Sequence, residues 1–204
     1  DSYEGQAQYF REEIAKYLKD WLDDNGYDLY SSGLKIYTTI DTRMQKYAEM
    51  AAEKQMRQIQ ARFNSHWRNM DPWRDENGEL VPNFIENIAK GLPVYESLKE
   101  KFPNQPDSVD FYMNKPHKVK LFDYAKGHIE KEMSTMDSIR YMVKFMHCSM
   151  VAMEPQTGAV RAWVGDIDFD TWKYDKVMAM RQPGSTFKLF VYTEAINQGL
   201  LPCD

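Results

Sequence analysis

The sequence has no apolar run of about 18 residues, so we expect no segment of it to cross a membrane. It also lacks a basic excess, because 26 Lys and Arg stand against 31 Asp and Glu for a net charge of −5. A protein that binds duplex nucleic acid is therefore disfavoured. Only two cysteines are present, Cys148 and Cys203. We interpret them as two buried thiols, while their disulfide state stays open because pairing needs geometry that a sequence does not supply.

The sequence also lacks the spacing of a metal centre. No two histidines stand at metal-ligand spacing on one predicted helix, and the four fall in different segments: His66, His117, His128 and His147. The acidic run 166–170 begins like a calcium loop, but Thr171 replaces the glycine at its sixth position and Val177 the glutamate at its twelfth. We therefore expect neither a zinc site nor a calcium site of the EF-hand type.

What is present is a globular composition, with 43% hydrophobic and 28% charged residues. The chain opens with Asp1-Ser2, which is neither a start methionine nor the basic head of a signal peptide. We therefore expect it to be a fragment of a longer protein.

Hydrophobic periodicity divides the chain into helices and strands. Apolar residues recur at helical spacing over 7–22, and Gly26 ends this amphipathic helix. The β-branched, alternating run 34–40 predicts a strand. Asp41 is placed to cap a helix running from Thr42 to about residue 64.

The remainder predicts an α+β fold with an antiparallel sheet. The segment 66–132 contains six prolines and is expected to be irregular, apart from a short helix over 94–101 and a strand over 119–122. A helix capped by Ser134 or Asp137 follows, with a buried stripe of Ile139, Met142, Val143 and Met146. A hairpin then joins 149–153 to 159–164 through a Pro- and Gly-containing turn, and a last helix runs from Ser185 to about Gln198.

The strongest chemical signal is Ser185-Thr186-Phe187-Lys188. Residues i and i+3 lie on one face of a helix, so the Lys188 amine can act as the base that a weak serine nucleophile needs. A lysine is a base only when neutral, which burial or a nearby cation achieves. In the first helical turn the Ser185 N–H has no intrahelical acceptor and can stabilise an oxyanion.

The spacing by itself is weak evidence. Chance yields about one Ser-x-x-Lys in a chain of this composition, and a second copy occurs at Ser32 and Lys35. That copy leads into the predicted strand, where residues three apart point to opposite faces.

Four blocks in order resemble class A (bifunctional) penicillin-binding proteins. The run 181–192 (Arg-Gln-Pro-Gly-Ser-Thr-Phe-Lys-Leu-Phe-Val-Tyr) resembles their nucleophile region. The run 33–41 with Gln45 resembles the linker between the glycosyltransferase and transpeptidase domains. The run 154–165 resembles the first hairpin of the transpeptidase domain, and the run 7–26 resembles the helix before the linker. The sequence departs from this pattern at Asp166, where a glycine is common, at Leu189, where a proline is usual, and at 174–176.

The resemblance implies a division into a linker over 1–41, a helix and inserted accessory region over 42–148, and the N-terminal part of a transpeptidase domain over 149–204. We expect 66–131 to be a lineage-specific insertion whose deletion leaves acylation largely intact. The family's second and third motifs, Ser-x-Asn and Lys-Thr-Gly, do not occur in this chain. The isolated chain is therefore expected to be inactive.

The resemblance also implies a function for the parent protein. Ser185 would attack the D-Ala-D-Ala end of peptidoglycan stem peptides, and β-lactams would acylate the same serine, with Lys188 as base. The parent would be anchored in the bacterial inner membrane facing the periplasm, carry an upstream glycosyltransferase and meet other cell-wall synthesis proteins. Open alternatives are a monofunctional class B transpeptidase, a non-catalytic penicillin sensor and an unrelated helical interaction domain.

Overall fold

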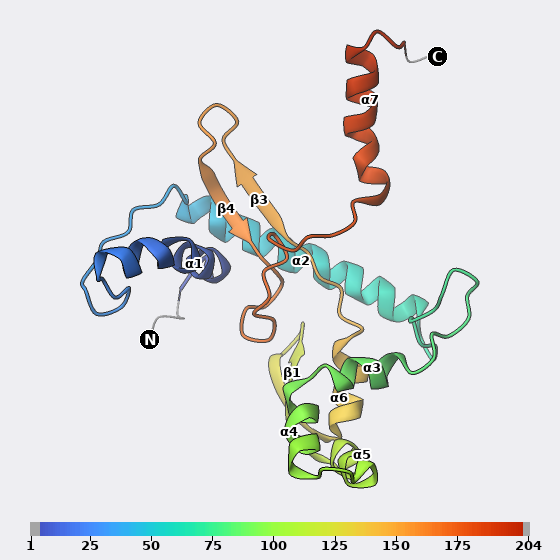
Figure 1. Ribbon diagram of the computed structural model, residues 1–204. Helices are drawn as coiled ribbons and strands as arrows, with labels where there is room; N and C mark the ends of the chain where they lie inside the picture. Colours follow the sequence, from blue (N-terminus) through green and yellow to red (C-terminus); the bar gives the residue numbers. More distant parts are fainter. Residues whose placement is uncertain (1–4, 202–204) are drawn as a thin grey trace.

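The computed structural model describes residues 5–201 and combines seven α-helices with two small antiparallel sheets in this part of the chain (Figure 1). The elements follow in the order α1 Gln8–Asn25, α2 Thr42–His66, α3 Phe84–Lys90, α4 Pro93–Lys101, α5 Pro106–Asn114, β1 His117–Asp123, β2 Gly127–Met133, α6 Thr135–Met142, β3 Met150–Met153, β4 Val160–Val164, the 3₁₀ turn η1 Gly184–Phe187 and α7 Lys188–Asn197. No helix among residues 5–201 has the length and apolar character needed to span a bilayer. The mixture of helices with antiparallel strands agrees with the predicted α+β class.

The two N-terminal helices form as the sequence predicts. Gly26 ends α1 in the left-handed region at φ 67°, which glycine adopts without a steric cost. Asp41 caps α2, since its side chain accepts hydrogen bonds from the backbone N–H groups of Arg43 and Met44. These hydrogen bonds lower the pKa of the Asp41 carboxyl, with Met44 contributing most.

The predicted strand over 34–40 is wrong. The segment runs without regular structure and contacts β4 through isolated hydrogen bonds near its end. Thr39 Oγ1 donates to the Val160 carbonyl at 2.7 Å and Arg161 Nη1 donates to the Thr39 carbonyl at 3.2 Å, while N of the following Asp41 donates to the Arg161 carbonyl at 3.0 Å. Most of its side chains are exposed. Its β-branched residues favour an extended backbone, but a strand also requires a partner along its length, which this segment meets only at its end.

Gln45 continues this contact and occupies the edge of β4 in place of a strand. Its side chain is fully buried. Nε2 donates to the Trp163 carbonyl at 2.8 Å, and Oε1 accepts from Trp163 N at 2.7 Å. One amide side chain thereby satisfies both backbone groups of Trp163, as a neighbouring strand would. Beside it, Ala48 of α2 packs on Ala162 and Val164.

We expect Gln45→Ala in the full-length protein to lower the free energy of unfolding by about 2–4 kcal/mol, because it leaves two backbone groups of Trp163 without partners. Urea denaturation measures the loss. Gln55→Ala, on the exposed side of the same helix, is the matched control and should change stability by less than about 0.5 kcal/mol. Equal losses in the two variants would contradict this account of Gln45.

The region 66–132 is more regular than predicted. The helix predicted over 94–101 and the strand over 119–122 are confirmed as α4 and β1, whereas α3, α5 and β2 were missed. Pro93 and Pro106 were interpreted as interruptions, but each stands at the first turn of a helix, where its missing N–H costs nothing. The core contains Ile85, Ala89, Val109, Met113, Met136 and Ile139.

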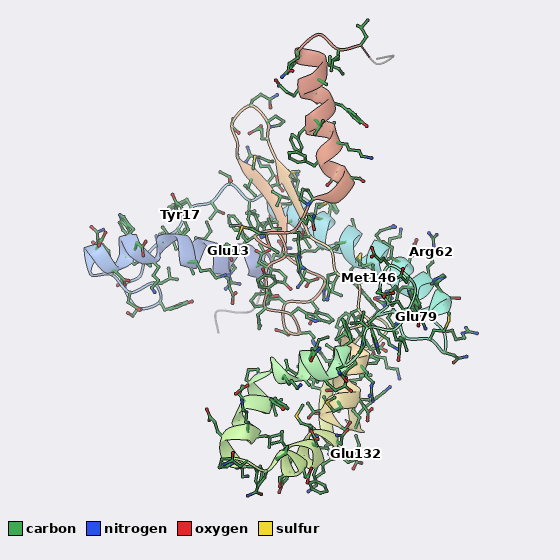
Figure 2. All side chains as sticks on the ribbon, turned by 45° about the vertical axis from the view of Figure 1, so that its right-hand side comes forward. Glu13, Tyr17, Arg62, Glu79, Glu132 and Met146 are labelled. Carbon is green, nitrogen blue, oxygen red and sulfur yellow. The ribbon has the colours of Figure 1, made fainter. Side chains whose placement is uncertain are left out.

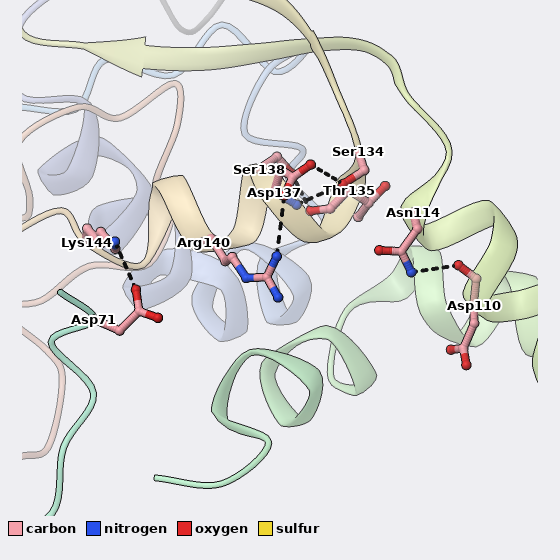
Figure 3. A network of polar contacts seen from close by, with 9 residues as sticks. All are labelled: Asp71, Asp110, Asn114, Ser134, Thr135, Asp137, Ser138, Arg140 and Lys144. Atoms are coloured by element: carbon pink, nitrogen blue, oxygen red, sulfur yellow. Dashed lines mark hydrogen bonds and ion pairs between the residues drawn. The ribbon is translucent and has the colours of Figure 1, made fainter. Parts of the chain in front are cut away.

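Helix α6 closes this region. Ser134 is its cap, since Ser134 Oγ accepts from Asp137 N at 3.0 Å and donates to Asp137 Oδ2 at 2.7 Å (Figure 3). Beyond the helix, Lys144 Nζ lies 3.2 Å from Asp71 Oδ1 and ties the end of the region to its beginning (Figure 3).

The buried stripe predicted for this helix is confirmed only in part, since Met142 and Val143 are half-buried. Ile139 is buried, but Met146 is 37% exposed. Helix α6 ends at Met142, so helical spacing does not apply to residue 146. Met146 instead lies alongside α2 (Figure 2), where its backbone N–H donates to Gln60 Oε1 at 2.8 Å.

Candidate active site

Ser185 lies on the 3₁₀ turn η1 rather than in the last α-helix, which begins at Lys188 and not at Ser185 as predicted. Gly184 enters the turn at φ 53°. Residues three apart eclipse one another in a 3₁₀ turn, so the spacing still keeps the Ser185 and Lys188 side chains on one side. Ser185 is the second residue of the turn, and its N–H therefore has no acceptor within it.

Both side chains are exposed. Within residues 5–201 no hydrogen bond or ion pair joins Ser185 to Lys188. The burial that the sequence analysis requires of a catalytic lysine is not provided by the described residues.

The helix that carries Lys188 has an uncovered apolar surface. It projects away from the other elements (Figure 1), and among the described elements η1 is the one against which it packs. Its large apolar side chains are half or more exposed: Leu189, Phe190, Val191, Tyr192 and Ile196. Exposure of so many apolar groups on one helix marks a surface that another part of a protein covers.

The chain reaches Ser185 through a tightly bonded loop over residues 165–177, called the nucleophile loop below. Lys176 N donates to the Gly165 carbonyl at 2.8 Å, and Trp163 Nε1 donates to Asp175 Oδ2, also at 2.8 Å. A side chain at Gly165 would collide with the ring of Tyr9 and with Asp175 Oδ1. The close approach of α1 to this loop therefore requires glycine at position 165.

Asp166 is a buried charge that the sequence analysis did not assign to a site. Its side chain is fully buried, and Oδ2 lies 2.9 Å from His147 Nδ1 and 3.0 Å from Lys176 Nζ. Burial works to raise the pKa of this carboxyl, but the hydrogen bonds from His147 and Lys176 outweigh it and hold the pKa below its usual value. The departure from glycine at this position was the available signal, and the sequence analysis noted it without assigning a partner or a role to Asp166.

Cys148 follows His147 and is a partly buried free thiol, whereas Cys203 lies outside the described residues. Burial, and then the nearby charge of Asp166, raises the pKa of the Cys148 thiol. A raised pKa disfavours the reactive thiolate. Cys148 was expected to be buried, and the structure shows it only partly buried.

Comparison with known proteins identifies two consecutive domains. The model of the penicillin-binding protein middle domain matches residues 68–146, and that of the penicillin binding protein transpeptidase domain matches residues 148–204. The second match contains Ser185 and Lys188. The middle-domain match contains most of the insertion expected at 66–131. This region therefore corresponds to a domain with its own family model, and that domain extends beyond residue 131.

The similar curated proteins are penicillin-binding proteins 1A. That of Rickettsia typhi (strain ATCC VR-144 / Wilmington) is 30% identical over 96% of this chain, that of Neisseria flavescens 28% over 96%, and that of Neisseria gonorrhoeae 30% over 86%. The chain spans about a quarter of the length of these relatives.

Two adjoining family matches and this similarity along nearly the whole chain lead to one conclusion. The chain belongs to the penicillin-binding proteins, of which it contains a middle domain followed by part of a transpeptidase domain.

Proposed function

We propose that the protein containing this chain is a class A peptidoglycan synthase whose transpeptidase domain uses Ser185 as its nucleophile. The observation that supports this most is the Ser-x-x-Lys sequence inside the transpeptidase match, with Ser185 on η1 and Lys188 at the first position of α7, a spacing that keeps both side chains on one side.

The proposed reaction is acyl transfer in two steps. Ser185 Oγ attacks the carbonyl of the penultimate D-alanine of a stem peptide while Lys188 Nζ takes its proton, and the Ser185 N–H binds the oxyanion. The peptide bond breaks and the terminal D-alanine leaves with a proton. An amine of a second stem peptide then attacks the acyl-enzyme, forms the cross-link and frees Ser185. A β-lactam acylates the same oxygen by opening its ring. The reaction requires no cofactor.

The same resemblance supports the remaining proposals about the parent protein. It would be anchored in the inner membrane with this segment on the periplasmic side, downstream of a glycosyltransferase domain. Its partners would be stem peptides, β-lactams and other proteins of cell-wall synthesis. We keep the boundaries 1–41, 42–148 and 149–204 as a working division of the chain.

Activation of Lys188 should come from parts of the transpeptidase domain that cover α7. We therefore expect the 204-residue chain to remain unlabelled by a fluorescent penicillin under conditions in which the full-length protein is labelled. Gel fluorescence with mass spectrometry of the adduct measures this. Stoichiometric labelling of the 204-residue chain would show that its own residues suffice, contrary to the exposure of Ser185 and Lys188.

A further inference from the structure

The nucleophile loop, residues 165–177, receives contacts from elements distant in sequence. From α1, Tyr9 Oη donates to the Trp172 carbonyl at 2.6 Å, and its ring packs edge-on against Phe169 with the ring centroids 4.9 Å apart. From β4, Trp163 holds Asp175. The helix before the linker and the first transpeptidase sheet thus meet at this loop.

Residues of the middle domain, and one residue at its junction with the transpeptidase domain, contact the other side of the same loop. His128 of β2 places Nε2 at 3.2 Å from Asp168 Oδ2 and 3.1 Å from Thr171 Oγ1. His147, at the junction of the two matched domains, pairs with Asp166. Two histidines on one side therefore face two carboxylates of the loop.

Aromatic packing reinforces these polar contacts. The Trp172 ring lies against Phe122 of β1 and Phe145, both at a centroid distance of 5.4 Å, and against His147 at 5.0 Å. Edge-to-face aromatic pairs at such distances are favourable beyond the area they bury. Trp172 is thus set among residues that precede the transpeptidase match.

The anchoring ends shortly before the nucleophile. Val177 N donates to Asp175 Oδ1 at 2.8 Å, and the chain from 178 to 183 then runs largely exposed to the turn that carries Ser185. The direction in which the chain leaves residue 177 therefore depends on how the nucleophile loop is held. An acyl-transfer rate is sensitive to displacements of about 1 Å at the nucleophile.

We propose that the middle domain, together with His147 at its junction with the transpeptidase domain, positions Ser185 by holding the nucleophile loop, with Asp166 and Asp168 as the positioning residues. This inference rests on the proposed function, because it concerns the rate of acylation at Ser185. It replaces the expectation that 66–131 can be deleted without affecting acylation, since Phe122 and His128 lie within that segment.

The test compares the full-length protein with its D166N/D168N variant and with D170N. Asp170 belongs to the same acidic run as the other two carboxylates, two residues after Asp168, but its side chain is 60% exposed and its ion pair is with Lys173 of the same loop, which makes it a matched control. For each protein we would measure the affinity of the non-covalent penicillin complex, the rate constant of acylation within it, and backbone amide exchange over 178–188.

We expect D166N/D168N to slow acylation by about ten- to a hundredfold, with the non-covalent affinity changed by less than about twofold and amide exchange over 178–188 accelerated. D170N should match the unaltered protein. An acylation rate in D166N/D168N equal to that of D170N would overturn the proposal, as would an equal loss of affinity and rate, which is the signature of general destabilisation.

Folding failure and failure of the proposed function remain distinguishable from failure of this inference. If the double variant does not fold, D168N alone carries the test, because Asp168 is 22% exposed and its loss is less costly than that of the fully buried Asp166. If the unaltered protein is not acylated, the proposed function is wrong. Amide exchange then decides the inference, and unchanged exchange over 178–188 in D168N would overturn it.

Discussion

Ser185→Ala in the full-length protein should abolish covalent labelling by a fluorescent penicillin. The reaction forms an ester to Ser185 Oγ, and alanine has no oxygen with which to form it. Ser185 sits on an exposed turn, so the substitution removes no buried contact and the protein should retain its stability. Loss of labelling with an unchanged thermal midpoint is therefore the expected result.

The chain contains its own control for this experiment. Ser32 also precedes a lysine by three residues, at Lys35, but its Oγ accepts a hydrogen bond from Asp28 N at 2.8 Å in a turn after α1. The Ser32→Ala variant should be labelled by the fluorescent penicillin to the same extent as the unaltered protein. Undiminished labelling of Ser185→Ala would refute the assignment of the nucleophile and with it the proposed function.

A second assay separates an enzyme from a penicillin sensor, because both would lose labelling in Ser185→Ala. A transpeptidase releases D-alanine from a stem peptide ending in D-Ala-D-Ala as it forms cross-links, and the release should disappear in Ser185→Ala. Labelling of the unaltered protein without any release of D-alanine would favour the sensor.

The local elements were predictable where one residue type has one physical role. Asp41 caps α2, Gly26 ends α1 and the hairpin of β3 and β4 forms around its Pro–Gly turn, because each signal acts within a few residues. The strand predicted over 34–40 failed because strand formation depends on a partner distant in sequence, and that edge of β4 is occupied by a glutamine side chain.

The candidate site also has one part that local sequence signals predict and one part that depends on residues distant in sequence. Ser185 and Lys188 could be proposed from the sequence because a short motif carries their chemistry, and their roles stay a prediction. The nucleophile loop was not found as a site. His128 is 40 positions away from its partner Asp168 in the sequence, and His147 is 19 positions away from Asp166. Spacing along the chain contains no signal for such pairs, and the sequence contains no indication of the partners that the two histidines have in the fold.

Lys188→Ala should slow acylation of the full-length protein by a factor of about 10²–10⁴, the usual contribution of a general base. Ser185 Oγ would remain in place but would have to lose its proton to water. The time course of labelling at several penicillin concentrations measures the rate constant. Lys35→Ala, which removes the exposed lysine of the other Ser-x-x-Lys copy, should leave the rate unchanged.

Lys188→Arg distinguishes a base from a positive charge. Arginine keeps the charge near Ser185 but stays protonated in proteins and cannot accept the hydroxyl proton. If Lys188 is the base, Lys188→Arg should be as slow as Lys188→Ala, within about a factor of ten. An arginine variant that acylates at nearly the unaltered rate would assign Lys188 to electrostatic stabilisation, and the proton acceptor would then have to lie in the part of the transpeptidase domain that covers α7.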